Sequence, residues 1–165
     1  IGHEIVHGYD DFGSRFDSNG NLRMWWTEVD KKQFDERTSC LVNQFNSYEV
    51  LPDLFMNGRL TLGENIADFG GIQIAYDAFK ESMKGKTPPD KIDGFTPEQR
   101  FFLGWAQVMA AKSTEEFKRS SITNNNHPLS PWRVNAPLSN MPQFAKAFDC
   151  KQSQAMIKKG MCAIW

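Results

Sequence analysis

The chain has 165 residues, of which 40% are hydrophobic and 24% charged, and its formal net charge is −1. This length and composition are typical of one globular domain with a buried core. The balanced charge, without a basic block, argues against a nucleic-acid partner, and no apolar run approaches the roughly 20 residues of a membrane-spanning helix.

The first nine residues are predicted to be the remainder of a helix, because a motif that belongs inside a helix begins at the third position. A natural start rarely interrupts a helix there, so we expect the chain to be part of a longer polypeptide. Residues 10–26 are rich in Gly, Asp, Ser and Asn and predict an ordered loop held by aromatic side chains. Thr27 can cap a helix that runs to about Val50.

A second long helix is predicted from about Thr61 to Met83. Its Gly70-Gly71 pair lowers helix propensity, which indicates close packing against a neighbouring element. After a Pro/Gly/Lys-rich loop, Thr96 and Gln99 form a capping-box pattern that opens a helix to about residue 111.

The last third of the chain is expected to contain two short helices, at about residues 114–121 and 139–148. The proline-containing segment between them, residues 122–138, reads as irregular. The whole chain is therefore predicted to be mainly α-helical, because little of it alternates at period 2.

The segment from His3 to His7 is an H-E-x-x-H motif. On a helix, positions i and i+4 share a face, so both imidazoles can reach one metal ion. Glu4 follows the first histidine, where its carboxylate can reach a water molecule at the metal rather than the metal itself. The motif predicts two ligands and a general base; the alternative is a solvated helix face with two unrelated histidines.

Glu64 and Asp68 lie at i and i+4 on the predicted second helix. A catalytic zinc site of the His₂Glu type takes one carboxylate from elsewhere in the chain and leaves a fourth position for water. We therefore predict Glu64 as the third ligand of one Zn²⁺ per chain, with Asp68 accepting the free ring N–H of a ligand histidine. The alternative is an exposed acidic face.

His127 is the third and last histidine of the sequence, and it lies in the proline-containing segment. An isolated histidine there is usually structural or exposed. Beside a zinc site, however, it becomes a candidate donor to the oxyanion of a tetrahedral intermediate. Arg133 is a candidate to bind a carbonyl or carboxylate of the substrate.

Cys40, Cys150 and Cys162 lack metal-type spacing such as C-x-x-C. They fit three buried thiols in a cytosolic protein. The alternative is one disulfide plus one cysteine whose partner lies outside this sequence, which implies an oxidising compartment.

Several sequence blocks occur together in a fixed order: HEIVHGYDDFGSRFD, TLGENIADFGG, FFLGWAQV, HPLSPWRVNAP and the terminal CAIW. This set resembles the neprilysin family of zinc metallopeptidases, which includes neprilysin, the endothelin-converting enzymes and bacterial oligopeptidase O. The resemblance covers essentially all 165 residues. It implies a mainly α, zincin-type fold, with residues 1–165 as the C-terminal part of one catalytic domain and the upstream part and cap domain absent.

The resemblance implies a zinc endopeptidase that acts on short peptides inside a closed cavity. Its implied residues are the ligands His3, His7 and Glu64, the catalytic Glu4, Asp68 and His127, and the substrate-binding Arg133, Val108 and Met109. Val108 and Met109 would line part of the pocket for the residue after the scissile bond.

The resemblance also implies that Cys40 pairs with Cys162 and that the partner of Cys150 lies in the missing N-terminal part of the polypeptide. The chain is therefore expected in a secreted, periplasmic or membrane-anchored ectodomain.

The chain departs from the family pattern at two places. Asn125 stands where the family often has an aspartate, which weakens the support for a charged His127. Met109-Ala110 replaces a common Trp-Cys, so one family disulfide should be missing. The family's substrate-aligning Asn-Ala strand and its helical cap also lie outside this sequence.

Two rival interpretations of the function follow: a zinc-binding chain that cannot align a peptide, and a structural zinc module.

Overall fold

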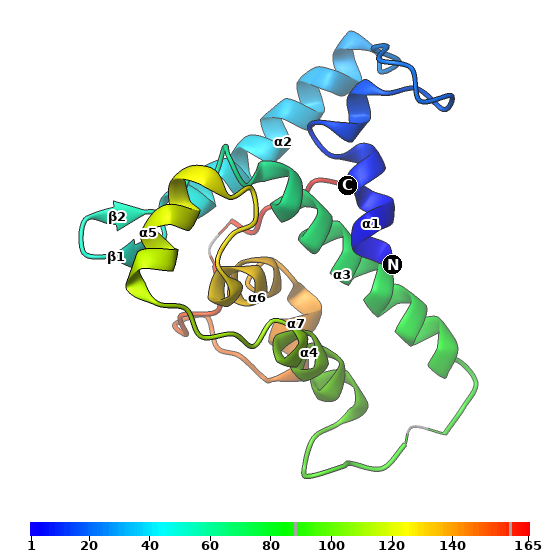
Figure 1. Ribbon diagram of the computed structural model, residues 1–165. Helices are drawn as coiled ribbons and strands as arrows, with labels where there is room; N and C mark the ends of the chain where they lie inside the picture. Colours follow the sequence, from blue (N-terminus) through cyan, green and yellow to red (C-terminus); the bar gives the residue numbers. More distant parts are fainter. Residues whose placement is uncertain (88, 159) are drawn as a thin grey trace.

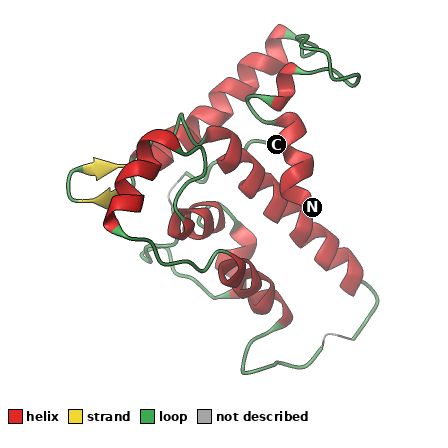
Figure 2. Ribbon diagram, in the orientation of Figure 1, coloured by secondary structure: helices red, strands yellow, loops and turns green. Residues whose placement is uncertain are grey.

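The structure is a computed structural model that describes residues 1–87, 89–158 and 160–165. Over these residues the protein is mainly helical with a two-stranded antiparallel sheet, as predicted (Figures 1 and 2). Among them, no helix combines the length and the apolar character needed to cross a membrane. The elements are α1 (Gly2–Val6), a 3-10 turn (His7–Tyr9), a second 3-10 turn (Gly13–Arg15), α2 (Glu28–Asn46), β1 (Glu49–Leu51), β2 (Leu54–Phe55), α3 (Leu62–Met83), α4 (Pro97–Val108), α5 (Glu115–Asn124), α6 (Ser130–Leu138) and α7 (Pro142–Ala147).

Two helices begin at the predicted threonine caps. The hydroxyl of Thr27 accepts a hydrogen bond from the backbone N–H of Asp30 at 3.1 Å. Thr96 forms the full capping box, since its hydroxyl accepts from the N–H of Gln99 at 3.2 Å and the Gln99 side chain accepts from the N–H of Thr96 at 2.9 Å. These contacts satisfy backbone N–H groups that the first turn of a helix leaves unpaired.

Several predicted helix boundaries are wrong by three or four residues: α4 ends at Val108 and α5 at Asn124, and α2 and α7 also differ. α2 ends at Asn46 rather than near Val50, because residues 49–51 pair with residues 54–55 in a hairpin. α7 covers only Pro142–Ala147 instead of residues 139–148. Its first residue is a proline, and residues 139–141 form the turn that follows α6.

Helix α6 lies in the segment that was predicted to be irregular, so that prediction is also wrong. Pro131 occupies the first turn, where its missing N–H would have no partner. Pro137 lies inside the helix and cannot donate to the carbonyl of Arg133, four residues earlier. The indole N–H of Trp105 in α4 donates to that carbonyl at 3.1 Å instead. A tertiary hydrogen bond therefore replaces the helical one.

Helix α3 runs through the centre of the fold, with α1, α2 and α6 packed against it (Figure 1). Every residue from Glu64 to Ile72 is buried. The main core cluster gathers side chains from α1, α2, α3 and the C-terminal segment: Val6, Phe34, Leu41, Val42, Leu62, Ile66, Ala67, Phe69, Cys162 and Ile164. Glu64 and Asp68, the buried acidic residues of α3, therefore lie in a stretch of helix whose other buried residues are largely apolar.

A disulfide joins Cys40 on α2 to Cys162, with the two Cα atoms 5.7 Å apart. This confirms the pairing implied by the resemblance and excludes three free thiols. Cys150 has no bonded partner among the described residues. Two residues beyond the disulfide, the carbonyl of Ile164 accepts a hydrogen bond from Nη1 of Arg37 at 3.0 Å. The disulfide thus fixes the C-terminal segment against α2, and closing so long a loop contributes about 5 kcal/mol in the chain-entropy account.

Candidate metal centre

The H-E-x-x-H helix α1 lies directly against α3, with the two backbones in contact (Figure 1). A Cβ atom added at Gly71 would lie only 2.5 Å from the backbone nitrogen of His3. One added at Gly2 would lie 2.7 Å from the carbonyl oxygen of Gly71. The absence of these side chains is what lets the helices approach, as the Gly70-Gly71 pair predicted. The backbone contact sets the position of His3 relative to α3.

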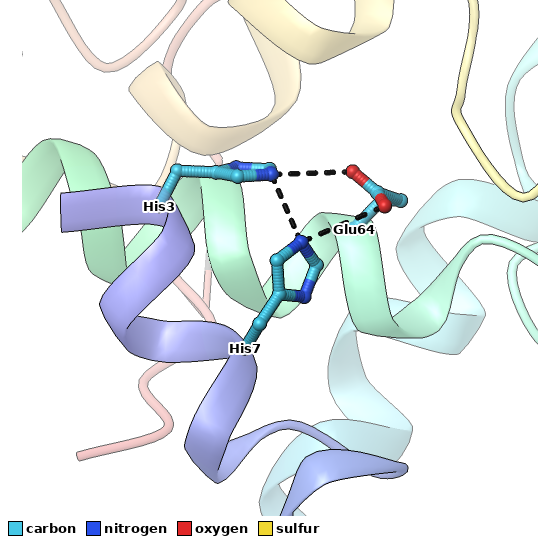
Figure 3. A group of neighbouring side chains, drawn as sticks. All are labelled: His3, His7 and Glu64. Carbon is cyan, nitrogen blue, oxygen red and sulfur yellow. Dashed lines mark hydrogen bonds and ion pairs between the residues drawn. The ribbon is translucent and has the colours of Figure 1, made fainter. Parts of the chain in front are cut away.

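Three potential ligand atoms converge between α1 and α3 (Figure 3). Nε2 of His3 lies 3.0 Å from Nε2 of His7 and 3.4 Å from Oε2 of Glu64. Nε2 of His7 lies 3.6 Å from Oε1 of Glu64. Ligand atoms about 2.0–2.1 Å from a tetrahedral zinc ion lie about 3.3 Å from one another. The three predicted ligands therefore have the spacing that zinc requires.

The second nitrogen of each histidine ring faces a buried carboxylate. Nδ1 of His3 lies 2.8 Å from Oδ1 of Asp68, and Nδ1 of His7 lies 2.7 Å from Oδ2 of Asp10. A carboxylate that accepts the Nδ1–H holds the ring in the tautomer whose Nε2 carries a lone pair. The contact of His7 with Asp10 is a hydrogen bond, whereas that of His3 with Asp68 has the distance of an ion pair without a well-directed hydrogen bond. In both rings Nε2 faces the other ring and Glu64. The cluster is rich in acceptors, and a cation between them satisfies all three.

The carboxylates of the cluster are buried, which makes an unpaired negative charge there unfavourable. Glu64 is 6% exposed and Asp68 is 2% exposed, which excludes the alternative of a solvated acidic face. Oε2 of Glu64 accepts no well-directed hydrogen bond from the described residues, although Nε2 of His127 lies 3.2 Å away. Hydrogen bonding to Asp68, helped by the charges of Asp68 and Glu64, raises the pKa of His3 above 6.5, while burial acts in the opposite direction. Buried carboxylates of this kind are stable when they are paired or bind a metal.

Asp10 is a residue of this site that the sequence analysis did not identify. Its Oδ1 accepts hydrogen bonds from the backbone N–H groups of Phe12 at 2.8 Å and Gly13 at 2.6 Å, while its Oδ2 faces His7. The loop after α1 therefore fixes the carboxylate, and the carboxylate fixes the ring. The available signal was an acidic residue three positions after the second histidine of the motif.

Asp68 also binds the side chain of Arg133 through two parallel hydrogen bonds. Nε and Nη2 of Arg133 lie 2.7 Å from Oδ2 and Oδ1 of Asp68, respectively, and Nη2 lies 3.5 Å from Oε2 of Glu64. Arg133 is thus brought to the metal centre from α6. Its Nη1 makes no hydrogen bond to the described residues, so that group is available to another molecule.

The other two predicted catalytic side chains are more exposed. His127 lies next to Glu64, and its backbone N–H and Nδ1 lie 2.9 Å and 3.2 Å from Oδ1 of Asn125. The carboxylate of Glu4 is exposed on α1 and makes no hydrogen bond or ion pair with the described residues. The structure therefore gathers His127 and Arg133 beside the three ligands, and leaves Glu4 free in solvent on the ligand helix.

A cavity of about 250 Å³ adjoins His3 and Asp68. It runs between α3 and α4, and Val108 lines it, whereas Met109 lies outside its wall. A larger groove of about 620 Å³ lies along α2, from Met24 to Ser39, and contains none of the ligand residues. A further cavity of about 280 Å³ is lined by His7, Asp10 and Glu64. Both of these smaller cavities adjoin the metal centre, and the one beside His3 has the more apolar walls.

A sequence model described as peptidase family M13 matches residues 1–164. Neprilysin-1 of Caenorhabditis elegans is 41% identical over 170 aligned residues, and endothelin-converting enzyme 1 of Cavia porcellus is 38% identical over 167. Both alignments include all of this chain. The chain belongs to peptidase family M13.

The fold agrees with this membership of family M13. The crystal structure of Mycobacterium tuberculosis zinc metalloprotease ZMP1 in complex with an inhibitor superposes with a TM-score of 0.92 at 36% identity, covering 99% of this chain and 26% of that one. The chain spans only 22% of the length of either curated relative.

Proposed function

We propose that the protein is a zinc-dependent endopeptidase that hydrolyses short peptides, and that this chain supplies the C-terminal part of its catalytic domain. The observation that carries the proposal is the arrangement of two Nε2 lone pairs and a buried carboxylate at tetrahedral spacing. Membership of family M13 supports the same chemistry. His3, His7 and Glu64 would hold one Zn²⁺ and leave a fourth position for water.

Peptide hydrolysis needs an activated water, a proton carrier and a donor to the oxyanion. The zinc ion, when bound, supplies the activation of water and the polarisation of the scissile carbonyl. Glu4 lies one residue after a ligand with a free carboxylate, so it can accept the proton of the water and pass it to the leaving amine. His127 can donate to the oxyanion, and a donor of this kind typically contributes about 3 kcal/mol.

Asp68 and Arg133 are proposed to support the reaction from the other side of the centre. Asp68 orients His3 and anchors the guanidinium of Arg133. The free Nη1 of Arg133 would then bind a carbonyl of the substrate, because its position is fixed by the two hydrogen bonds to Asp68. Removing Arg133 is expected to raise KM as well as to lower kcat.

The compartment is proposed to be oxidising, because the Cys40–Cys162 disulfide persists where thiols are not kept reduced. A secreted, periplasmic or membrane-anchored ectodomain fits this requirement. The proposed partners are short peptides and the N-terminal part of the same polypeptide. The second candidate function, zinc binding without catalysis, is favoured by the exposure of the Glu4 carboxylate, which no contact with the described residues holds in place.

Metal content and peptide hydrolysis, measured on the same preparations, test the proposal. The parent protein should contain one zinc per chain and cleave internally quenched peptides. Glu64→Ala should lose most of the metal, whereas Glu4→Gln should keep the metal and lose hydrolysis, because a carboxamide cannot accept the proton. Near-parental turnover in Glu4→Gln would rule out Glu4 as the base. Zinc without hydrolysis in the parent would instead support the non-catalytic candidate.

A further inference from the structure

The cavity beside His3 and Asp68 is a trough between two helices. Its α3 wall includes Ile72 and Ala75, and its α4 wall includes Phe101, Trp105 and Val108. On α4 these residues follow the i, i+4, i+7 spacing of one helix face. The polar end of the trough is formed by His3 and Asp68, so the apolar walls begin where the ligands end.

Gly104 interrupts the α4 wall, in the interior of a twelve-residue helix. A glycine there destabilises a helix by about 1 kcal/mol relative to alanine, so its presence needs a reason. The usual reason is close packing, and Gly71 illustrates it with a hypothetical Cβ 2.5 Å from His3. Gly104 has no such neighbour, because a Cβ built on it meets no atom within 4 Å. Gly104 lines the cavity and is exposed, so its missing side chain leaves open space at the solvent-facing rim of the cavity.

We propose that Gly104 determines the size of the substrate side chain that the protein accepts beside the scissile bond. This inference rests on the proposed peptidase function, since it takes the cavity as the pocket for the residue after that bond. With glycine at this position, the trough stays open between Phe101 and Val108 and accepts a large apolar side chain. A side chain at position 104 would occupy that space without disturbing α4, because nothing packs there.

The expected effect follows from the way apolar pockets discriminate. One methylene gained or lost in such a pocket changes selectivity by about 10- to 200-fold. A leucine at position 104 adds several carbons to the cavity wall, so a phenylalanine substrate should lose much of its kcat/KM. An alanine substrate needs little room and should keep its kcat/KM. The ratio of the two therefore reports on the pocket and is independent of the concentration of active enzyme.

The test uses the zinc-loaded protein and two quenched peptides that differ only in having Phe or Ala after the scissile bond. Gly104→Leu should lower the Phe/Ala ratio of kcat/KM at least tenfold, and Gly104→Ala should give an intermediate ratio. Gln107→Leu is the matched control, because it adds the same side chain to an exposed position of α4 outside the cavity. Its ratio should equal that of the parent.

The outcomes separate this inference from the function on which it rests. If the parent cleaves both peptides but Gly104→Leu and Gly104→Ala keep the parental ratio with full zinc content, Gly104 does not set the pocket size and the inference is overturned. If Gln107→Leu changes the ratio as much as Gly104→Leu, the effect is not specific to the cavity, which also overturns it. If the zinc-loaded parent cleaves neither peptide, the proposed function fails first.

Discussion

Replacing Gly71 by alanine should displace the ligand His3 and weaken zinc binding. The added Cβ would lie 2.5 Å from the His3 nitrogen, whereas real Cβ contacts are essentially never shorter than 3.0 Å and ordinary ones begin at 3.4 Å. The backbones must therefore separate by 3.0 − 2.5 to 3.4 − 2.5, or 0.5 to 0.9 Å. The atoms that it meets are backbone atoms of His3 and Gly2, which cannot rotate away as a flexible side chain would. The movement therefore passes to α1 as a whole.

The size of the effect on the metal can be judged from the same geometry. Nδ1 of His3 lies 2.8 Å from Oδ1 of Asp68, and an increase of 0.5 to 0.9 Å would lengthen this contact to 3.3 to 3.7 Å, beyond the usual range of N–H···O contacts. Metal–ligand distances tolerate only about 0.2 Å. Losing the support of a ligand histidine typically costs 10- to 100-fold in metal affinity, so we expect at least a tenfold weaker zinc complex.

Protein stability should change less than metal affinity in this variant. Overpacking costs about 1–3 kcal/mol, while alanine in place of glycine returns about 1 kcal/mol of helix propensity. Competition with a fluorescent chelator measures the zinc affinity, and thermal unfolding of the metal-free protein measures the stability. Gly8→Ala is the control, because a Cβ at that position meets no atom within 4 Å. Unchanged zinc affinity in Gly71→Ala would refute the idea that this backbone contact positions His3.

Three further predictions address the support of the site and the fold. Asp10→Asn should weaken zinc binding 10- to 100-fold, because an amide oxygen holds the imidazole N–H less strongly than a carboxylate; parental affinity in a competition assay would contradict this. The double variant Cys40→Ser/Cys162→Ser should lose about 2–5 kcal/mol of unfolding free energy in chemical denaturation, whereas Cys150→Ser should lose little. His127→Ala should lower kcat with full zinc content, and release of zinc from this variant would show that its role has been misread.

The ligand set could be predicted from the sequence because each half of it is local. His3 and His7 share a helix face, and so do Glu64 and Asp68, which fixes the relative positions of the side chains within each pair. The contact between the two helices is the part that helix periodicity does not encode, because the helices are distant in sequence. Gly71 on the second helix nevertheless indicated close packing there. The structure adds the distances that make the two pairs a single centre.

Asp10 and helix α6 could not be predicted, because both depend on contacts that no local pattern encodes. The role of Asp10 requires the chain to turn after α1 so that two backbone N–H groups meet its carboxylate. The helical state of residues 130–138 requires Trp105, distant in sequence, to supply the hydrogen bond that Pro137 removes. Sequence periodicity predicts which way a side chain faces, but not which distant group will satisfy a carbonyl.

Arg133 is held at both of its polar ends, since its guanidinium binds Asp68 and its carbonyl binds Trp105. Arg133 thereby connects Asp68, whose carboxylate lies against the ligand His3, with Trp105, which lines the neighbouring cavity. Substitutions at positions 68 and 105 are therefore expected to be epistatic, even though they lie on different helices. Libraries that aim to alter selectivity should vary position 105 together with Arg133, because a change in the indole that shifts the α6 carbonyl also moves the guanidinium beside the metal.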